Sequence, residues 1–420
     1  MCALGALLLG ATPATGQDFV TELQRGLVDE AALTVHLRSY YFDRAFPAPP
    51  SAVAWAGGGW IGYETGWLLD VFRFGAVGYT SQPMAAGATN GTLLLYPGQN
   101  GPYGYTVLGQ AYGQMRFRDQ QFSAYRQLIN QPEVNPQDNR MTPNTFEAYL
   151  FSGSFGAFSY LGGYVDKMKP RNAVEFIDMA KAAGGPDDVK SGMWLGGIDY
   201  RPSAGPRLRL SGYSVQDILS SGYGDFAWSH SITDDIDVNL RGQFMAQGSN
   251  GANKLTGEAF GTWVLGAGID FSWRELTLVG SFTQTAATAP YRNPYGLWPG
   301  YSNMMLRQFH RANESAFTTS ARIDFAAINL PGLAFVANVT LGSGAIDPAT
   351  RLPLSTDNEY DFTLDFMLAD SAIDFPDALR PLWIRARSAT LNRFQNGAVS
   401  TVRDFRVILN YEWKFGGRTR

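Results

Sequence analysis

Hydrophobic and polar positions alternate along many segments of this chain, and the alternation is clearest near its end, over residues 401–415. One set of alternate positions there is apolar throughout: Phe405, Val407, Leu409, Tyr411, Trp413 and Phe415. The positions between them are polar with one exception, Ile408: Asp404, Arg406, Asn410, Glu412 and Lys414. Successive side chains of a β-strand point to opposite faces. The pattern therefore predicts a strand with one apolar and one polar face, as in the wall of a membrane β-barrel.

About eighteen segments carry such strand patterns, and short turns alternate with longer loops between them. They cover residues 32–44, 51–69, 71–80, 103–118, 121–129, 146–151, 157–167, 193–200, 207–213, 223–232, 236–247, 260–271, 275–285, 315–325, 333–341, 359–366, 382–394 and 401–415. No repeat with a period of about 20–50 residues is present, which excludes propellers and solenoids. The predicted fold is all-β, a transmembrane antiparallel β-barrel of about 18 strands. A soluble β-sandwich is the alternative, although it rarely needs so many strands with aromatic-capped apolar faces.

The N-terminus reads as an export signal rather than as part of the fold. A short apolar run is followed by the small residues Ala14-Thr-Gly16, which predicts a signal peptide over residues 1–17, truncated at its start because no positive region precedes it. Residues 18–420 would then form a single barrel domain. The alternative is that the apolar run is a buried strand. The chain's one cysteine, Cys2, would leave with the signal peptide, so no disulfide is expected.

Composition narrows the class of function. The chain has 420 residues, 17 % of them charged, and a net charge of −4, whereas a nucleic-acid binder would need a basic excess. Its 47 glycines, 27 phenylalanines and 20 tyrosines fit an all-β fold with many short strands. No run approaches the roughly 20 apolar residues that a spanning helix needs. A membrane protein of this composition would therefore cross as a barrel.

Several segments resemble the OprD-type outer-membrane porins. They are residues 37–44 (LRSYYFDR), 135–147 (NPQDNRMTPNTFE), 215–219 (VQDIL), 299–302 (PGYS) and 405–411 (FRVILNY), in the family's order from about residue 18 to residue 415. The resemblance implies an 18-stranded, monomeric barrel in the outer membrane of a Gram-negative bacterium, narrowed by inward-folded loops. It also implies passive diffusion of small carboxylates, such as amino acids and aromatic or aliphatic acids, along a ladder of basic residues. Outer-membrane lipids and the barrel-assembly machinery would be the other partners.

Two features depart from the family. Barrels of this kind often end on an aromatic residue that the assembly machinery reads, but here Phe415 is followed by Gly-Gly-Arg-Thr-Arg420. Relatives selective for basic amino acids carry an acidic residue where this chain has Arg307-Gln308. The second departure favours plain or aromatic carboxylates over cationic substrates.

Arginines on the predicted polar faces are the candidate substrate pathway. Arg385 and Arg387 share one face of a strand, Arg406 lies on the next strand, and Arg38 lies on the first strand, which closes against the last. A charge inside a membrane protein is costly unless it faces water or a partner, and a guanidinium meets a carboxylate bidentately. A second basic group is predicted on the strands leading into the 130–144 loop: Arg116, Arg118 and Arg126. The alternative is that these arginines only brace the barrel by pairing with Asp404, Asp365 or loop acids.

Two long connections are the candidate constriction. Residues 130–144 hold three prolines and several Asn and Asp, and long loops can fold into a pore where barrel walls cannot. The residues predicted at or near the narrowest point are Asp138, Asn139 and Arg140. The 286–313 loop offers a second lip of Tyr301, Ser302 and Asn303, whereas Trp298 is expected to pack. As an alternative, Asp138 and Arg140 form a turn-stabilising pair that holds the loop to the wall.

The sequence does not predict an enzyme. Its three histidines are His36, His230 and His310, and the serines beside His230 would point to the opposite face of a strand. It contains no metal-binding motif, and the Gly57–Gly59 run lies in a strand-like stretch rather than in a phosphate loop. No cofactor or metal is expected. The remaining alternatives are a non-selective general porin, a purely structural barrel and an outer-membrane barrel hydrolase.

Overall fold

A computed structural model describes residues 16–417 of the chain. The predicted signal peptide falls outside the described residues except for its last two positions, and Cys2 falls outside them as well. The described chain begins with helix α1 (Gly16–Gln24) and a π-helical turn, η1 (Arg25–Asp29). The boundary between signal peptide and barrel domain stays a prediction.

Most of the described chain is β-strand. The strands are β1 (Ala32–Ala45), β2 (Ala52–Glu64), β3 (Phe72–Pro83), β4 (Tyr105–Phe117), β5 (Gln120–Gln127), β6 (Thr145–Phe155), β7 (Phe158–Lys169), β8 (Ile177–Asp178), β9 (Met193–Tyr200), β10 (Arg207–Val215), β11 (Leu219–Thr233), β12 (Ile236–Gly248), β13 (Gly261–Trp273), β14 (Leu276–Thr285), β15 (Ser315–Asp324), β16 (Leu333–Ser343), β17 (Thr356–Met367), β18 (Leu382–Gln395) and β19 (Ala398–Gly416). The short helices are α2 (Met179–Ala182), η2 (Phe325–Ile328) and η3 (Leu368–Asp370).

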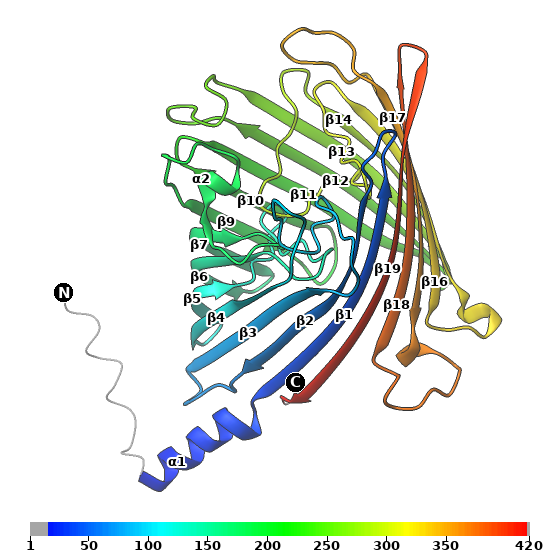
Figure 1. Ribbon diagram of the computed structural model, residues 1–420. Helices are drawn as coiled ribbons and strands as arrows, with labels where there is room; N and C mark the ends of the chain where they lie inside the picture. The colour runs from blue at the N-terminus through cyan, green and yellow to red at the C-terminus, as the bar shows by residue number, and fades with distance from the viewer. Residues whose placement is uncertain (1–15, 418–420) are drawn as a thin grey trace.

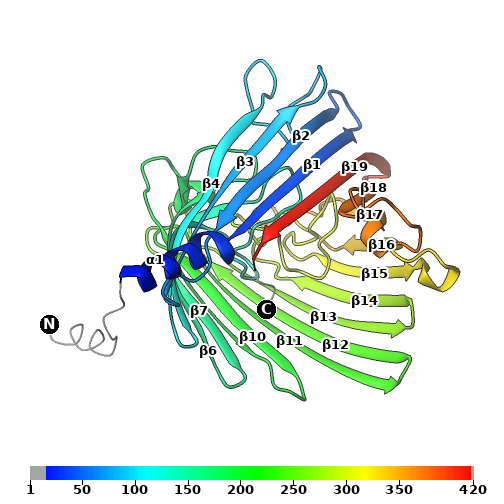
Figure 2. The same cartoon turned by 90° about the horizontal axis from the view of Figure 1, so that it is seen from below.

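The strands form one closed antiparallel barrel. Each long strand pairs with its sequence neighbours, β7 pairs with β9, and β1 pairs with both β2 and β19, which closes the sheet. The two-residue β8 only adds to the end of β7, so the 19-stranded sheet is an 18-stranded barrel with one extra strand. Figures 1 and 2 show β1 beside β19 at this closure. The predicted fold class is confirmed, because the long strands pair in sequence and the first closes against the last.

The predicted alternation of faces is also confirmed. On β19, Asp404 and Arg406 are buried, whereas Phe405 and Leu409 on the other face are 47 % and 37 % exposed. Large apolar side chains are exposed in the same way on the outer face of nearly every strand. These side chains form the apolar belt that a membrane barrel presents to lipid, and the polar face lines the interior.

The helices of the described residues have at most nine residues each. No helix in residues 16–417 is long and apolar enough to cross a membrane.

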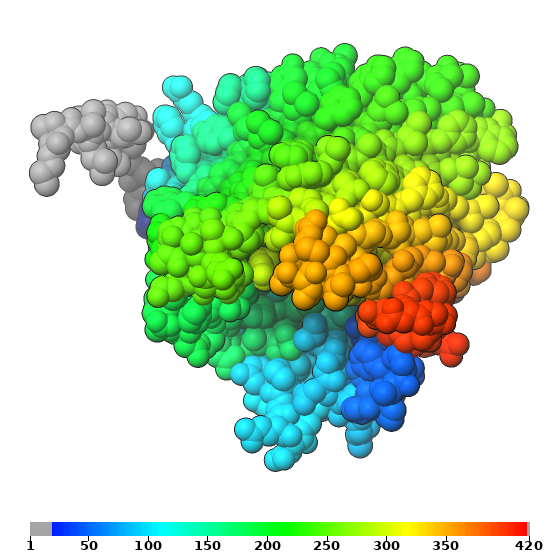
Figure 3. All heavy atoms as spheres, turned by 90° about the horizontal axis from the view of Figure 1, so that it is seen from above, coloured from blue at the N-terminus to red at the C-terminus, as the bar shows by residue number. Residues whose placement is uncertain are grey.

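Two long connections fill the middle of the barrel, as predicted. Loop 128–144 joins β5 to β6, loop 286–314 joins β14 to β15, and Figure 1 shows both inside the ring of strands. Their side chains Val134, Met141 and Trp298 are at most 1 % exposed. Trp298 packs with Tyr223 and other buried residues of the wall, the packing role expected for it. Seen from the end where the long loops lie, the molecule has a shaded depression between the β1–β4 side and the opposite side (Figure 3).

The glycine run in β2 makes room for the interior groups of β1. Gly58 lies opposite Arg38, and Gly59 has a φ of 126°, outside the range that side chains favour. A Cβ atom at Gly59 would overlap the carbonyl oxygen of His36. The neighbouring Trp60 stacks on His36 with ring centroids 3.9 Å apart.

Replacing Gly59 by alanine is expected to destabilise the barrel by about 2 kcal/mol or more, through strained backbone and the overlap with β1. The urea concentration that half-unfolds the refolded protein measures this change. Gly78→Ala on β3 is the matched control, because a Cβ there meets nothing within 4 Å. Equal midpoints for the two variants would contradict the argument.

Candidate functional site

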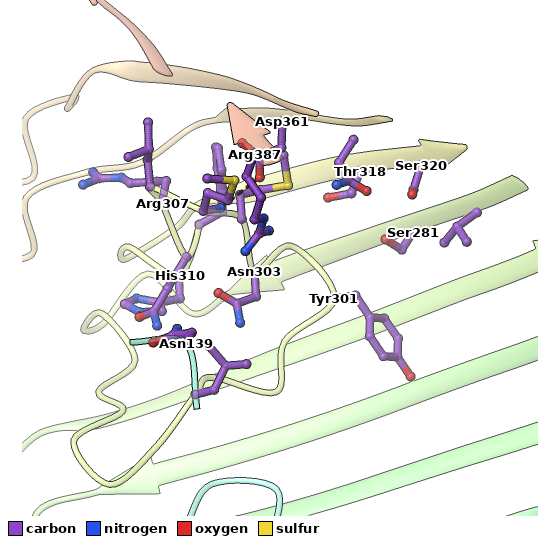
Figure 4. Close-up of a pocket in the computed structure, with 18 of the residues that line it drawn as sticks. Asn139, Ser281, Tyr301, Asn303, Arg307, His310, Thr318, Ser320, Asp361 and Arg387 are labelled. Carbon is purple, nitrogen blue, oxygen red and sulfur yellow. Dashed lines mark hydrogen bonds between the residues drawn. The ribbon is translucent and has the colours of Figure 1, made fainter. Parts of the chain in front are cut away.

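A cavity of about 810 Å³ lies between the two inward loops and the wall of β12–β19. We call it the constriction cavity. Seven arginines of the described chain line it: Arg140, Arg171, Arg241, Arg307, Arg311, Arg387 and Arg406. Among the described residues, Asp270 and Asp361 are the only carboxylates in its lining. In Figure 4, Arg387 extends from the wall beside Asp361 toward Asn303, with Asn139 and His310 on the loop side.

Loop 128–144 is held to the first strand by Arg38. Its guanidinium donates from Nη1 to Asp138 Oδ1 over 2.6 Å and from Nη2 to Asp138 Oδ2 over 3.2 Å. The same group donates to the backbone oxygen of Arg140, and its Nε donates to Asn410 Oδ1 over 2.7 Å. Arg38 is only 8 % exposed, so this ion pair is partly withdrawn from water. It anchors the loop against the closure of the barrel.

Loop 286–314 is held to the wall by acidic residues of β17, which is separated from β1 only by β18 and β19. The backbone N–H of Met305 donates to Asp361 Oδ2 over 3.0 Å, and that of Leu306 donates to Glu359 Oε1 over 2.6 Å. Arg307 Nε lies 2.9 Å from Asp357 Oδ2. These contacts fix the loop apex that forms one lip of the cavity.

The two loops are tied to each other as well. Asn135 donates from its backbone to the oxygen of Tyr295 over 3.3 Å, and its side-chain oxygen accepts from Leu297 N over 2.7 Å. Glu133 accepts from the hydroxyl of Tyr291 and from Ser221 Oγ on β11, the latter over 2.8 Å. One of the Glu133 carboxyl oxygens is buried without a hydrogen-bond partner. Burial raises the pKa of Glu133 to about 7, although the two hydroxyl donors oppose the shift.

This buried carboxyl makes stability depend on pH. The folded protein holds the proton of Glu133 up to about pH 7, whereas the unfolded chain releases it near 4.5. The free energy of unfolding should therefore fall by roughly 3 kcal/mol as pH rises through this window. Glu133→Gln stays neutral and should lose that part of the dependence. Urea unfolding at pH 4 and pH 8 measures it, and an unchanged difference between the two pH values in the variant would refute it.

The arginines on the closing strands differ in their partners. Arg406 donates from Nε to Asp404 Oδ1 over 2.6 Å, and Arg44 on β1 shares the same carboxylate at 2.8 Å. Arg385 pairs bidentately with Asp365, at 2.6 and 2.9 Å. Among the described residues, the one hydrogen-bond partner of Arg387 is a hydroxyl, Thr363 Oγ1 at 3.1 Å.

Three cavity-lining arginines have no ion pair. Within residues 16–417, no carboxylate oxygen lies within 4.0 Å of Arg140, Arg171 or Arg387, whereas the other four lining arginines each have one. Arg140 instead donates to the backbone oxygens of Thr92 and Asn139, at 2.8 and 2.7 Å. Arg171 donates to the side-chain oxygen of Asn139. A guanidinium has five N–H donors, so these groups keep donors for an anion in the cavity.

The structure brings some of the predicted site residues together. Those that line the constriction cavity are Asn139, Arg140, Tyr301, Asn303, Arg387 and Arg406. Arg38 and Asp138 bind each other, and Arg385 binds Asp365, beside the cavity rather than in its lining. Ser302 is fully buried and shares a hydrogen bond with Thr283 Oγ1 at 2.8 Å. Asp138 and Arg140 do not pair with each other, but Arg38 connects both to the wall.

The second predicted basic group lies on β4, on β5 and in the turn between them, the segments that lead into loop 128–144. Arg116 and Arg118 lie at the end of β4 that is remote from loop 128–144, because β5 has to run the length of the wall before the loop begins. Arg116 stacks on Trp67 and donates to the backbone oxygen of Asp70 at 2.8 Å. Arg118 occupies the β4–β5 turn with a φ of 52°.

Arg126 does precede loop 128–144, but it is engaged elsewhere. Its Nε donates to Glu147 Oε1 over 3.0 Å, and its guanidinium lies 4.1 Å from the centre of the Phe176 ring. It is not part of the cavity lining.

Four arginines that line the cavity were not predicted as site residues: Arg171, Arg241, Arg307 and Arg311. The sequence could have indicated that Arg241 faces the pore, since it lies on the polar face of the strand predicted over residues 236–247. It pairs with Asp270 at 2.5 Å, and its guanidinium lies 4.6 Å from the Tyr301 ring. Arg171 lies in the connection from β7 to β9, and no local pattern marks it as facing the pore.

His310 lies in the lining, and burial lowers its pKa to about 4, so it is neutral at pH 7. Within residues 16–417, no three or more His, Cys, Asp or Glu side chains are placed to hold a metal ion.

Comparison with known proteins finds one family and one fold. The family model described as "outer membrane porin, OprD family" matches residues 25–415. Pseudomonas aeruginosa OpdK, crystallised with vanillate, is 19 % identical with a TM-score of 0.81, covering 92 % of this chain and 99 % of that one. OccK9 (OpdG) of the same species is 20 % identical with a TM-score of 0.81, covering 93 % and 100 %. A BenF-like porin from Pseudomonas fluorescens is 18 % identical with a TM-score of 0.79, covering 92 % and 99 %. No curated protein sequence matches the chain.

Proposed function

The chain belongs to the OprD family of outer-membrane porins, and we propose that it is a selective channel for small carboxylates. Family membership places it in the outer membrane of a Gram-negative bacterium, as a β-barrel that passes small solutes. The proposal adds a substrate class, a passive mechanism, a monomeric state and the absence of an enzymatic activity.

The observation that carries the proposal is the set of unpaired guanidiniums in the constriction cavity. Arg140, Arg171 and Arg387 line it without an ion-pair partner in the described chain. An unpaired charge away from bulk water is costly, and an arriving carboxylate would offset that cost with charge-assisted hydrogen bonds. OpdK, the neighbour crystallised with vanillate, supports a carboxylate as the ligand class.

The mechanism follows from the two sides of the cavity. The carboxylate is drawn toward Arg387, Arg406 and Arg140, and the rest of the solute meets hydroxyl and amide groups from Ser281, Asn303, Thr318 and Ser320. Binding has to be weak and divided among several sites, so that the solute leaves as readily as it enters. No step consumes energy, so the concentration gradient sets the direction.

The candidate residues take different roles in this proposal. Arg387, Arg406, Arg140 and Asn139 contact the solute. Arg38 and Asp138 position the loop, and Arg385 braces β17 against β18. Arg116, Arg118 and Arg126 are not in the cavity lining, and the proposal gives them no contact with the solute at the constriction.

A general porin without substrate preference is the second candidate, and planar-bilayer recording separates the two. Single channels of the refolded protein are recorded in KCl, with reversal potentials under a salt gradient and with added benzoate. Anion-selective channels that benzoate blocks reversibly would support the proposal. Large channels with no selectivity and no block would establish a general porin instead. The tightly tied loops favour the first result.

A further inference from the structure

Positive charge gathers at the edge of the constriction cavity, where Arg140 and Arg406 of its lining approach Arg44 behind them. The guanidinium carbons of Arg406, Arg44 and Arg140 lie 5.0, 5.1 and 5.3 Å from the centre of the same ring, that of Phe42 on β1. Within the described chain, Asp404 is the only carboxylate paired with any of the three, and it serves Arg44 and Arg406 together. Three cations around one ring thus share one anion.

Two more arginines extend this group in different directions. Arg387 lies opposite Arg406 in the β18–β19 register, on the wall. Arg171 reaches in from the connection between β7 and β9 and donates to the Asn139 side chain, next to Arg140. We call Arg140 and Arg171 the loop pair, and Arg387 and Arg406 the wall pair. The positive charge of Arg406 repels Arg140, Arg171 and Arg387.

Each of the other three arginines in the cavity lining is paired with a carboxylate. Arg241 pairs with Asp270 at 2.5 Å, and Arg307 pairs with Asp357 at 2.9 Å. Arg311 pairs with Glu314 and also lies 3.5 Å from Asp357. The excess positive charge therefore lies on Arg140, Arg171 and Arg387, and on Arg406 only because it shares Asp404 with Arg44. Asp361 offsets part of the charge near Arg387.

We infer that the cavity accepts solutes with two or more carboxylate groups in preference to monocarboxylates, one group at the wall pair and another at the loop pair. The inference deepens the proposed function and rests on it. Arg406 already holds Asp404, so the charges left for a solute are Arg387 on the wall and the loop pair. A single carboxylate bound at one of these two places leaves the other without a counter-charge. A second carboxylate on the same small solute reaches the other place without further loss of translational freedom.

The lowered pKa values of Arg140 and Arg171 agree with a site for an anion at the loop pair. Burial, followed by repulsion from Arg406 and Arg171, lowers the pKa of Arg140 to about 9. Burial and Arg406 lower the pKa of Arg171 to about 10. Both groups are still protonated at pH 7, and both carry a cost of burial, with a smaller share from neighbouring arginines, that an anion would relieve.

A series of rings with one, two and three carboxylates tests the inference. Benzoate, isophthalate and trimesate share the same benzene ring, so block of the single-channel current compares charge at nearly constant shape. In the wild type, isophthalate should bind about ten-fold or more tightly than benzoate, the gain expected from one further charge-assisted contact. Ionic strength is held constant across the series.

Arg171→Gln identifies the second contact. The isophthalate-to-benzoate affinity ratio should fall from about ten to about two, because the loop pair loses one of its two charges. Arg403→Gln is the matched control: Arg403 is exposed on β19, on the same outward face as Phe405, so its loss changes the net charge equally but should keep the ratio. The heat-dependent mobility shift of folded barrels on gels confirms that each variant folds.

The outcomes separate the inference from the proposed function. Equal block by benzoate and isophthalate in the wild type, or an unchanged ratio in Arg171→Gln, would overturn the inference and leave a carboxylate channel. If none of the three anions blocked an otherwise conducting channel, the proposed function itself would fall. A ratio that dropped equally in Arg403→Gln would show a general charge effect and also overturn the inference.

Discussion

Replacing Arg387 by glutamine is expected to weaken carboxylate binding in the channel by about 10- to 100-fold, the range for one charge-assisted hydrogen bond. Arg387 lines the cavity, and its one hydrogen-bond partner in the described part of the chain is the hydroxyl of Thr363. Its charge is therefore available to a solute. Glutamine keeps some length and polarity but removes the positive fork that a carboxylate meets. The block of single-channel current by benzoate, titrated in wild type and variant, measures the loss.

Arg385→Gln is the matched control for this experiment. Arg385 lies two residues away on the same face of β18, but its guanidinium is held bidentately by Asp365. Its loss should change benzoate binding far less while destabilising the barrel more, since a buried carboxylate is left with only Trp383 as partner. If the two variants lost affinity equally, long-range charge rather than direct contact would explain the channel's preference.

Replacing Arg38 by methionine is expected to release loop 128–144 from the wall and to cost about 3 kcal/mol of stability. The substitution leaves Asp138 without its ion pair and the backbone oxygen of Arg140 without its donor. The loop then loses its anchor at the closure of the barrel, although Asn135 and Glu133 still tie it to Leu297 and Tyr291 of loop 286–314. Conductance should rise, and anion selectivity should fall, because Arg140 moves with the loop.

Single-channel recording and urea unfolding together check this second expectation. Arg322→Gln on β15 is the control, since Arg322 is exposed on the same face of its strand as the cavity-lining Ser320 and approaches Asp324 only to 4.0 Å. Its removal should change neither conductance nor stability strongly. An Arg38→Met channel with wild-type conductance and selectivity would show that the other contacts suffice to hold the loop.

The fold was accessible from the sequence because barrel strands carry their orientation locally. Period-two alternation placed Arg406 inside and Phe405 outside without any knowledge of their neighbours, and burial follows that pattern. The segment predicted over residues 193–200 coincides with β9. The segment predicted over 51–69 was too long, since β2 ends at Glu64 and Leu69 and Asp70 adopt left-handed backbone angles in a turn.

The electrostatics of the site depended on tertiary structure. Arg385 and Arg387 are indistinguishable by local pattern, yet the β17–β18 register sets Asp365 opposite the first and Thr363 opposite the second. Arg171 enters the cavity through a connection whose course no periodicity describes, and Arg38 is drawn to a loop 100 residues away. The sequence by itself therefore determined which faces meet water and which meet lipid, because each strand repeats that choice every two residues. Only the closed barrel, with its loops in place, decided which charges are neutralised, because ion pairing depends on atoms brought within a few ångströms by distant parts of the chain.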